Sequence, residues 1–250
     1  MRYWICMDDT DMPGTKGTGW LVQEICRELK DLGLGESSAI SRHQLFVHED
    51  IPFTSHNSAM CFELELENQN LVPRLMDYLV SCLESRCQPG SDPGLCVTGP
   101  LDKEKQRQLS AFGTRAKQAV CTKQDAYALA QNMGIHLSEH GGTGDGIIGA
   151  LAGTGLRMTG NDGRYRGWYN LGKPGDVVSV ADLCAYPFID TVVRSNGSEL
   201  SLSDKVVIGS EKTKTVRMGF HQVVTTTENE TAEETGIALR TITKQEAKSY

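Results

Sequence analysis

Hydrophobic spacing along the first hundred residues constrains the fold more than any other feature of the sequence. Leu21, Ile25 and Leu29 recur at four-residue intervals, which predicts an amphipathic helix. Phe62 and Leu64 alternate with charged residues, which predicts a half-buried strand. The expected strands are 2–7, 38–47, 58–66 and 94–98, and the expected helices are 18–32 and 70–85. This β-α-β-β-α-β order predicts a ferredoxin-like part over residues 1–99.

The chemistry of the chain changes after Gly99-Pro100. We expect an α+β protein in two parts, with residues 100–250 forming a mixed α/β, kinase-like part. Its expected features are two helices within 101–134 broken near Cys121-Thr122, a glycine-dense segment at 140–155, a β-rich region at 164–224 and a mobile loop at 225–236.

Composition and charge exclude several classes of protein. The net charge of −7 argues against a broadly basic nucleic-acid surface. No apolar run is long enough to span a membrane, and the N-terminus lacks the features of a signal peptide. The eight cysteines form no C-x-x-C pair, so we expect reduced thiols and no zinc site. We expect a cytoplasmic protein with no membrane partner.

An acidic cluster directly follows the first expected strand, in "MDDTDMPGTKGTG". Asp8, Asp9 and Asp11 repel one another, by about 1 kcal/mol per close pair even in a water-like medium. A bound Mg²⁺ relieves that repulsion, and Mg²⁺ takes one or two carboxylates together with substrate phosphates. The alternative is a solvated acidic turn in which Asp11 or Thr15 caps the next helix.

The segment "PGTKGTG" leads into the first expected helix. Amide groups at a helix N-terminus favour an anion, and Lys16 adds positive charge there. We therefore expect Thr10, Lys16 and Thr18 to make secondary contacts with a bound nucleotide, although the P-loop pattern is absent.

The segment "HGGTGDGIIGALAGTG" is the most glycine-dense part of the chain. Close approach of main-chain amides to phosphate oxygens is one reason for so many glycines, and a tight helix-packing turn is the other. The candidate phosphate-binding residues are Gly141, Gly142, Thr143, Gly144, Asp145, Gly146 and Gly149. The pattern G-x-G-x-x-G occurs here, but the preceding residues look helical, which argues against dinucleotide binding.

Polar residues elsewhere are less specific. Asn57 lies between two expected strands and is a candidate contact point for the nucleotide. Arg157, Arg164 and Arg166 follow the glycine segment and either clamp phosphate oxygens or form a solvated surface. The spacing of the histidines does not suit a metal site.

Three stretches in order resemble a known family. They are "DDTD", "IPFTSHNSA" and "GIIGALA", accompanied by "DPGL" at 92–95. Together they resemble the catalytic region of the archaeal 2-agmatinylcytidine synthetases, which modify an isoleucine tRNA, over roughly residues 2–160. That resemblance implies use of ATP to phosphorylate a carbonyl oxygen of a cytidine, which agmatine then displaces. The resemblance implies that the family's functional motifs correspond to Asp8, Asp9 and Asp11, to Asn57, and to Gly146 and Gly149.

The chain also departs from that family. "MPGTKGTGW" replaces a Gly-Met-Cys-Thr-Thr type segment, and we expect the family's OB-fold and zinc ribbon to be absent. We expect a Mg²⁺/ATP-dependent phosphoryl-transfer enzyme of the ligase or kinase type, with Asp8, Asp9 and Asp11 as catalytic and metal-binding residues. Its second substrate is a small molecule or nucleoside, and a homo-oligomer is compatible with the sequence. The alternatives are a nucleotide-binding regulatory module without turnover, and a tRNA-modifying enzyme whose tRNA anchor lies on a partner chain.

Overall fold

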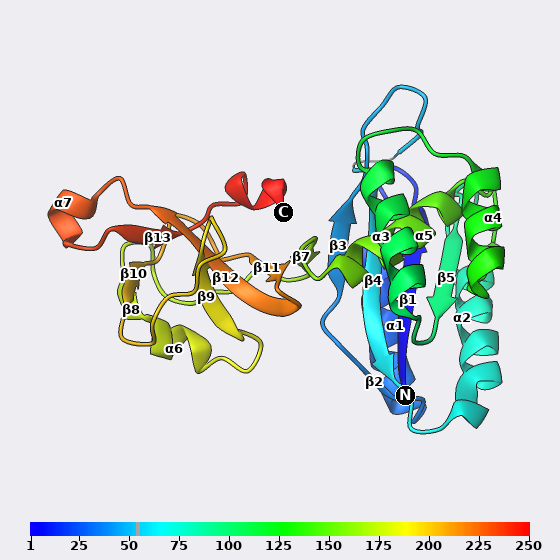
Figure 1. The fold of residues 1–250 in the computed structure, drawn as a ribbon, viewed down its shortest axis with the longest axis horizontal. Helices are drawn as coiled ribbons and strands as arrows, with labels where there is room; N and C mark the ends of the chain where they lie inside the picture. The colour runs from blue at the N-terminus through cyan, green and yellow to red at the C-terminus, as the bar shows by residue number, and fades with distance from the viewer. Residues whose placement is uncertain (54–55) are drawn as a thin grey trace. The chain divides into compact units, whose positions relative to one another are not determined.

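The chain divides into two compact units, Met1–Thr159 and Gly160–Tyr250, in a computed structural model that describes residues 1–53 and 56–250 (Figure 1). The boundary expected after Gly99 falls inside the first unit, because the strand and helices that follow it pack on the same sheet.

The first unit is built on an antiparallel sheet with the strand order β6-β5-β1-β4-β3. The short strand β2 also pairs with β4. The elements are β1 (Arg2–Asp8), α1 (Thr18–Asp31), β2 (Glu36–Ser37), β3 (Ser41–Gln44), β4 (Ser58–Glu65), α2 (Val72–Arg86), β5 (Gly94–Thr98), α3 (Lys103–Ala116), α4 (Lys123–Met133), β6 (His136–Glu139) and α5 (Gly146–Thr159).

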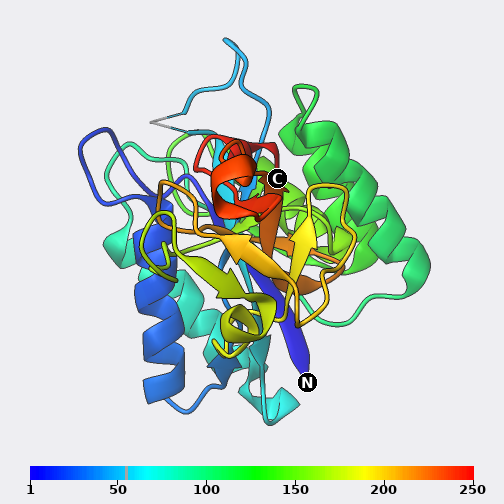
Figure 2. The same cartoon turned by 90° about the vertical axis from the view of Figure 1, so that its left-hand side faces the viewer.

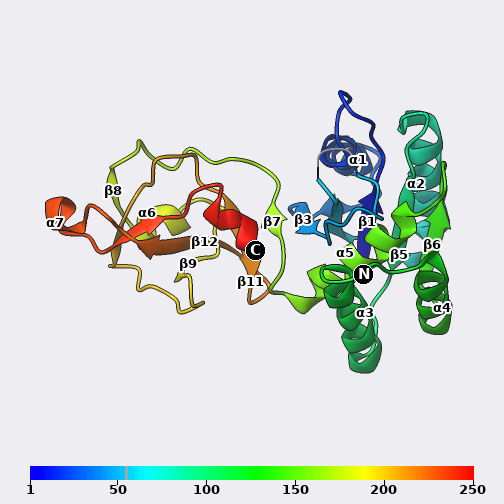
Figure 3. The ribbon, with the colours of Figure 1, turned by 90° about the horizontal axis from the view of Figure 1, so that it is seen from above.

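Each face of this sheet carries its own hydrophobic core. Ile5 and Met7 of β1 pack with the apolar residues of α1 and α2 on one face. Cys6, between them in the sequence, packs with α3, α4 and α5 on the other face. Figure 3 shows the two groups of helices on opposite sides of the strands. The alternation of side chains along a strand therefore produces a sheet covered by helices on both faces.

Helix α5 lies unusually close to its neighbours. A Cβ atom at Gly153 would lie 2.6 Å from Cys6 Sγ and 2.8 Å from Ala59 Cβ. On α3, a Cβ at Gly113 would lie 2.7 Å from the carbonyl oxygen of Ala152. Small residues thus let α5 approach both the sheet and α3, and larger side chains at these positions would force the elements apart.

The second unit is a β-rich structure with its own core. Strand β12 pairs with β11 and β13 in antiparallel fashion and with β9 in parallel fashion, and β10 pairs with β8 and β13. Helix α6 packs on these strands through Val180 and Leu183. Figure 2 shows the ribbon of this unit from its own side. The elements are β7 (Arg164–Tyr165), β8 (Val177–Ser179), α6 (Val180–Cys184), β9 (Thr191–Arg194), β10 (Lys205–Val207), β11 (Thr215–Met218), β12 (His221–Glu228), α7 (Ala232–Thr235) and β13 (Leu239–Thr241).

Most elements expected from the sequence are present. The strand expected at 94–98 has the predicted bounds, and the helices expected around a break near Cys121-Thr122 are α3 and α4. All eight cysteines are free thiols, as expected, and six are buried. Among the described residues, no helix combines the length and apolar character needed to cross a membrane.

Three secondary-structure expectations were wrong. The strand expected at 38–47 is present only as the short strand β3, because the chain leaves the sheet on either side of Ser41–Gln44. Residues 225–236 are not simply a mobile loop, because β12 continues to Glu228 with Thr225 and Thr226 fully buried, and α7 follows. The residues before the glycine segment are not wholly helical, because α4 ends at Met133 and β6 follows. Strand β6 pairs antiparallel with β5, whereas a dinucleotide site needs a parallel βαβ unit, so dinucleotide binding remains disfavoured for a different reason.

Candidate functional site

The acidic cluster begins where β1 ends. Asp9 has a φ angle of +51°, a left-handed conformation that aspartate tolerates better than most residues, so the chain turns sharply after Asp8. The amide of Asp9 donates a hydrogen bond to Asp8 Oδ1 at 3.0 Å. Asp8 itself is buried, with 8% of its surface exposed. Strand β1 thus ends on the buried Asp8, and the partly exposed Asp9 follows it directly.

Both carboxyl groups resist ionisation. Burial, followed by the charge of Asp9, raises the pKa of Asp8 to about 8. Burial raises the pKa of Asp9 to about 6, and the charges of Asp92, Asp11 and Asp145 add to the effect. Asp92 and Asp145, which are distant from Asp9 in the sequence, therefore lie near its carboxyl group in the fold. A bound cation would reverse these shifts, because it favours the ionised form.

Asp11 is directed at the start of α1. Its Oδ1 accepts hydrogen bonds from the amide and the hydroxyl of Thr18, both at 2.9 Å. The hydroxyl of Thr10 donates to Thr18 Oγ1 at 3.1 Å. The helix N-terminus thus stabilises the Asp11 carboxylate, as the capping alternative predicted. Thr10 and Thr18 are brought together beside the acidic cluster, and both are buried.

Lys16 lies in the exposed loop before α1. Its Nζ is 3.9 Å from the centroid of the Trp20 ring, a cation–π contact. The structure therefore places this expected phosphate contact on Trp20, and reaching a phosphate would require the side chain to leave the ring.

The glycine segment is held by a carboxylate. Asp92 Oδ1 accepts hydrogen bonds from the amide of Thr143 and, at 3.0 Å, from the amide of Gly144. From α4, Lys123 Nζ donates to the carbonyl oxygen of Thr143 and also binds the Glu139 carboxylate. The loop therefore presents amides suited to an anion, and an anionic side chain of the same protein occupies two of them.

The glycines of this segment also serve packing. A Cβ atom at Gly142 would overlap Asp92, one at Gly144 would overlap Glu139, and one at Gly146 would overlap the carbonyl oxygen of Asp92. At Gly141 the nearest neighbour would be Pro93 Cδ at 3.2 Å. The alternative of a tight packing turn thus accounts for these glycines without a ligand.

Gly149, one turn into α5, connects the two motifs. A Cβ atom there would overlap Asp8 Oδ2. The glycine segment and the acidic cluster are therefore in contact, although they are well separated in the sequence. Asp145, at the start of the helix, raises the pKa of Asp9 and so belongs to the same acidic group.

Asn57 makes local contacts. Its Nδ2 donates to the carbonyl oxygen of Phe46 at 2.6 Å, and its own carbonyl oxygen accepts from the amide of Leu45. Asn57 therefore fastens the β3–β4 connection. Of the expected "IPFTSHNSA" motif, residues 54 and 55 lie outside the described residues.

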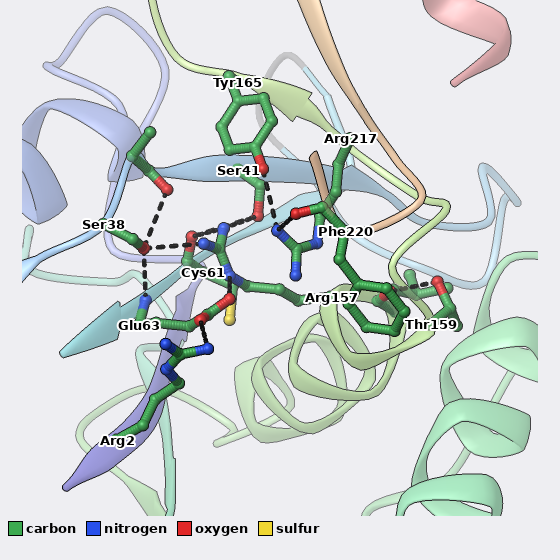
Figure 4. Close-up of polar contacts among 12 residues, drawn as sticks. Arg2, Ser38, Ser41, Cys61, Glu63, Arg157, Thr159, Tyr165, Arg217 and Phe220 are labelled. Carbon is green, nitrogen blue, oxygen red and sulfur yellow. Dashed lines mark hydrogen bonds and ion pairs between the residues drawn. The ribbon is translucent and has the colours of Figure 1, made fainter. Parts of the chain in front are cut away.

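Arg157, near the end of α5, is one of the most buried side chains of the first unit, with 1% exposed. It forms an ion pair with Glu63 at 3.0 Å and donates to the hydroxyls of Ser38 and Ser41 (Figure 4). It is neither a phosphate clamp nor a solvated charge.

In the second unit, Arg164 is buried, and burial lowers its pKa, whereas Arg217 donates to the Tyr165 hydroxyl at 2.9 Å (Figure 4).

The donor chemistry of the acidic cluster fits Mg²⁺, although the described residues contain no group of three or more histidine, cysteine, aspartate or glutamate side chains arranged to hold a metal ion. Mg²⁺ keeps several waters and binds through one or two carboxylates. Asp8 and Asp9, whose pKa values are raised by burial and by neighbouring carboxylates, are the residues that fit this role best.

Sequence reasoning missed Asp92, Lys123 and Glu139 as parts of this site. Asp92 stands in "DPGL", which the resemblance to the synthetase family had marked without giving the residue a role. Lys123 and Glu139 belong to ordinary polar helix and strand surfaces, and nothing in their spacing indicates that they reach the glycine segment.

The chain was compared with protein families, curated proteins and solved structures. No family model matches the chain, and no curated protein matches it. Among solved structures, the complex of TiaS, a tRNA agmatidine synthetase, with an isoleucine tRNA and ATP has a TM-score of 0.53 at 26% sequence identity. The chain is similar to tRNA agmatidine synthetase. The match covers 62% of this chain and 36% of TiaS, and it is thus limited to part of TiaS.

Two further structures agree. A "tRNA fluorescent labeling enzyme" has the same TM-score, identity and coverage. TiaS in complex with the isoleucine tRNA, AMPCPP and agmatine has a TM-score of 0.52 at 25% identity. The chain spans about a third of the length of the TiaS structures it matches. The share of this chain that is covered is close to the share that the first unit makes up.

Proposed function

We propose that the chain is a Mg²⁺/ATP-dependent enzyme that transfers a phosphoryl group to a carbonyl-type oxygen of a nucleotide or small-molecule substrate. The observation that carries the proposal is the meeting of the acidic cluster and the glycine segment at Asp8 and Gly149. An unspecialised fold has little reason to gather five carboxylates there, since each adds to the cost of ionising the others. The similarity to TiaS, solved with ATP, supports the same function.

Phosphoryl transfer is mainly a matter of positioning and of neutralising charge. Asp8 and Asp9 would hold Mg²⁺, which neutralises phosphate oxygens when it is bound. Asp11 orients Thr18 through two hydrogen bonds, so that the Thr18 hydroxyl and the N-terminus of α1 face the cluster. The Lys16 ammonium group would leave the Trp20 ring and contact a phosphate. The amides of Thr143 and Gly144 would bind a phosphate oxygen after Asp92 moves away.

The finer fold assignment belongs to the same proposal. We infer that residues 1–99 form a ferredoxin-like unit, supported by the antiparallel order β5-β1-β4-β3 and by the two helices on one face. Residues 100–159 add α3, α4, β6 and the glycine segment to that sheet.

Calorimetry of ATP binding with and without Mg²⁺ tests the proposal, on the wild-type chain and on the Asp8→Asn/Asp11→Asn double variant. Binding that requires Mg²⁺ and is lost in the double variant supports it. Glu104→Gln, an exposed carboxylate on α3, serves as the control and should bind like the wild type. Absence of binding in the wild type removes the enzyme proposal. Binding without turnover of any acceptor favours a regulatory module.

A tRNA acceptor is the second candidate, because two of the similar structures contain an isoleucine tRNA. The match covers only 36% of TiaS, and we propose that further contacts to tRNA come from the second unit or from a partner chain. Transfer of the ATP γ-phosphate to an unmodified tRNA transcript, compared with transfer to free cytidine, distinguishes the two acceptors.

A further inference from the structure

The second unit presents an exposed tryptophan flanked by two lysines. Trp168 is 43% exposed, in the segment between β7 and β8. Lys214 Nζ is 4.7 Å from the centroid of its ring, and Lys244 Nζ is 5.8 Å from it. These three residues come from three separate segments, so the fold rather than the local sequence brings them together.

The segment that carries Trp168 is firmly anchored. The amides of Tyr169 and Thr213 each donate to the other's carbonyl oxygen, at 3.0 and 2.9 Å. The Tyr169 ring stacks on Phe188 with a centroid distance of 4.1 Å. Lys214 Nζ donates to the carbonyl oxygen of Gly167 at 2.7 Å. Because Tyr169 is held against the core, Trp168 is displayed on the outside on a rigid support, which lowers the entropy cost of binding a ligand.

An exposed indole with two ammonium groups over its ring has a definite chemical preference. Because both ammonium groups lie over the ring, a base stacks on the indole once Lys244 moves off it, and the lysines then offer positive charge to the phosphates that flank the base. We propose that Trp168, Lys214 and Lys244 form a binding surface for single-stranded nucleic acid, in which a base stacks on Trp168 and the lysines contact flanking phosphates.

Charge and exposure favour this partner over an acidic peptide. A peptide carboxylate would use the lysines but leave the indole face without a planar partner, whereas a nucleotide uses both. Lys244 is exposed and able to swing from the ring toward a phosphate. The inference deepens the second candidate function, because an RNA-binding surface on Gly160–Tyr250 would serve a tRNA acceptor, but it requires no ATP and is tested without it.

Fluorescence anisotropy on the full chain without ATP tests the surface, with a labelled single-stranded RNA of about ten nucleotides, which lies within the usual site size. Trp168→Ala should weaken binding by about tenfold or more, and Trp168→Phe should retain most of it because the ring remains. Lys244→Gln should reduce the slope of log affinity against log salt by about 0.7. The matched control is Trp20→Ala, since Trp20 is also exposed and also carries a lysine over its ring, and this variant should bind normally.

Three results overturn the inference: no RNA binding by the wild type, equal losses in Trp168→Ala and Trp20→Ala, or displacement of RNA by poly-glutamate as effective as by unlabelled RNA. A single-stranded DNA of the same sequence shows which groups of the nucleic acid are recognised. Equal affinity for DNA and RNA indicates stacking and phosphate contacts alone, whereas tighter binding of RNA indicates that the 2′-hydroxyls are also recognised. RNA binding is measured without ATP, so the result can be interpreted even if the chain binds no ATP.

Discussion

The carboxyl group of Asp8 lies directly against Gly149, so close that no side chain fits at position 149. One residue ends the first strand and the other belongs to the first turns of α5. Their contact fixes the distance between the acidic cluster and the glycine segment, and it helps to bury Asp8, whose carboxyl group has its pKa raised to about 8 chiefly by that burial. The chemistry proposed for the first unit depends on this contact.

Gly149→Ala should therefore disrupt the site. The new methyl group would overlap Asp8 Oδ2 and lie 3.0 Å from Leu45 Cδ1, so that α5 or β1 must shift. We expect a loss of about 1–3 kcal/mol in the free energy of unfolding, the usual cost of overpacking a core. ATP binding should weaken at the same time, measured by calorimetry at a temperature where the variant is folded.

Gly99→Ala is the matched control for that substitution. A Cβ atom at Gly99 would make an ordinary contact of 3.5 Å with the Tyr3 ring, far from the acidic cluster in the sheet register. Its stability and ATP binding should stay near wild type. Equal behaviour of the two variants would show that the contact between Asp8 and Gly149 has no special role.

Local sequence was sufficient for several elements of the first unit and insufficient for the site. The helix near 18–32 and the strand at 94–98 were predictable because their apolar spacing matches one structural period. The bonds from Thr143 and Gly144 to Asp92 join residues about fifty positions apart, and no spacing rule describes such a contact. The same glycines that suggested a phosphate site are also required by packing, so the two interpretations could not be separated from the sequence.

Arg157 should be essential for the stability of the first unit. Its guanidinium group is buried, bonded to Glu63, Ser38 and Ser41, and its loss would leave the Glu63 carboxylate, whose side chain is only 11% exposed, without its closest charge partner. Removing one partner of a buried ion pair typically costs about 3–5 kcal/mol. Because Arg2 also lies 3.3 Å from the Glu63 carboxylate, we expect Arg157→Ala to lower the free energy of unfolding by up to that amount in urea titrations.

The control for Arg157 is an ion pair on the surface. Arg115 lies 3.1 Å from Asp125, and both side chains are nearly half exposed. Arg115→Ala should change stability by about 1 kcal/mol or less, because solvent screens the pair. If Arg157→Ala is as mild as Arg115→Ala, the buried network contributes little to the fold.

Acid should weaken the second unit through Glu246. Hydrogen bonds from Arg240, in the first place, and from Thr243 lower the pKa of Glu246 to about 2, from an ordinary value of 4.5. The folded state therefore binds fewer protons than the unfolded state between these values, and stability is lost as the pH falls from 4.5 toward 2. Glu246→Gln should remove this part of the pH dependence in thermal unfolding curves, whereas Glu234→Gln, an exposed glutamate of the same unit, should leave it intact.

Asp92 should control the mobility of the glycine segment. Its carboxylate binds the amides of Thr143 and Gly144, so Asp92→Ala should release both amides to solvent and raise their rates of hydrogen exchange by roughly tenfold or more, corresponding to about 1.4 kcal/mol of local opening free energy. Asp92→Asn keeps one acceptor oxygen and should raise the rates less. Exchange is measured by mass spectrometry or NMR, with the amides of α2 as an internal reference, since the core of the opposite face should be unaffected. Unchanged exchange at Thr143 and Gly144 in Asp92→Ala would show that Lys123 and the packing of the glycines hold the loop without the carboxylate.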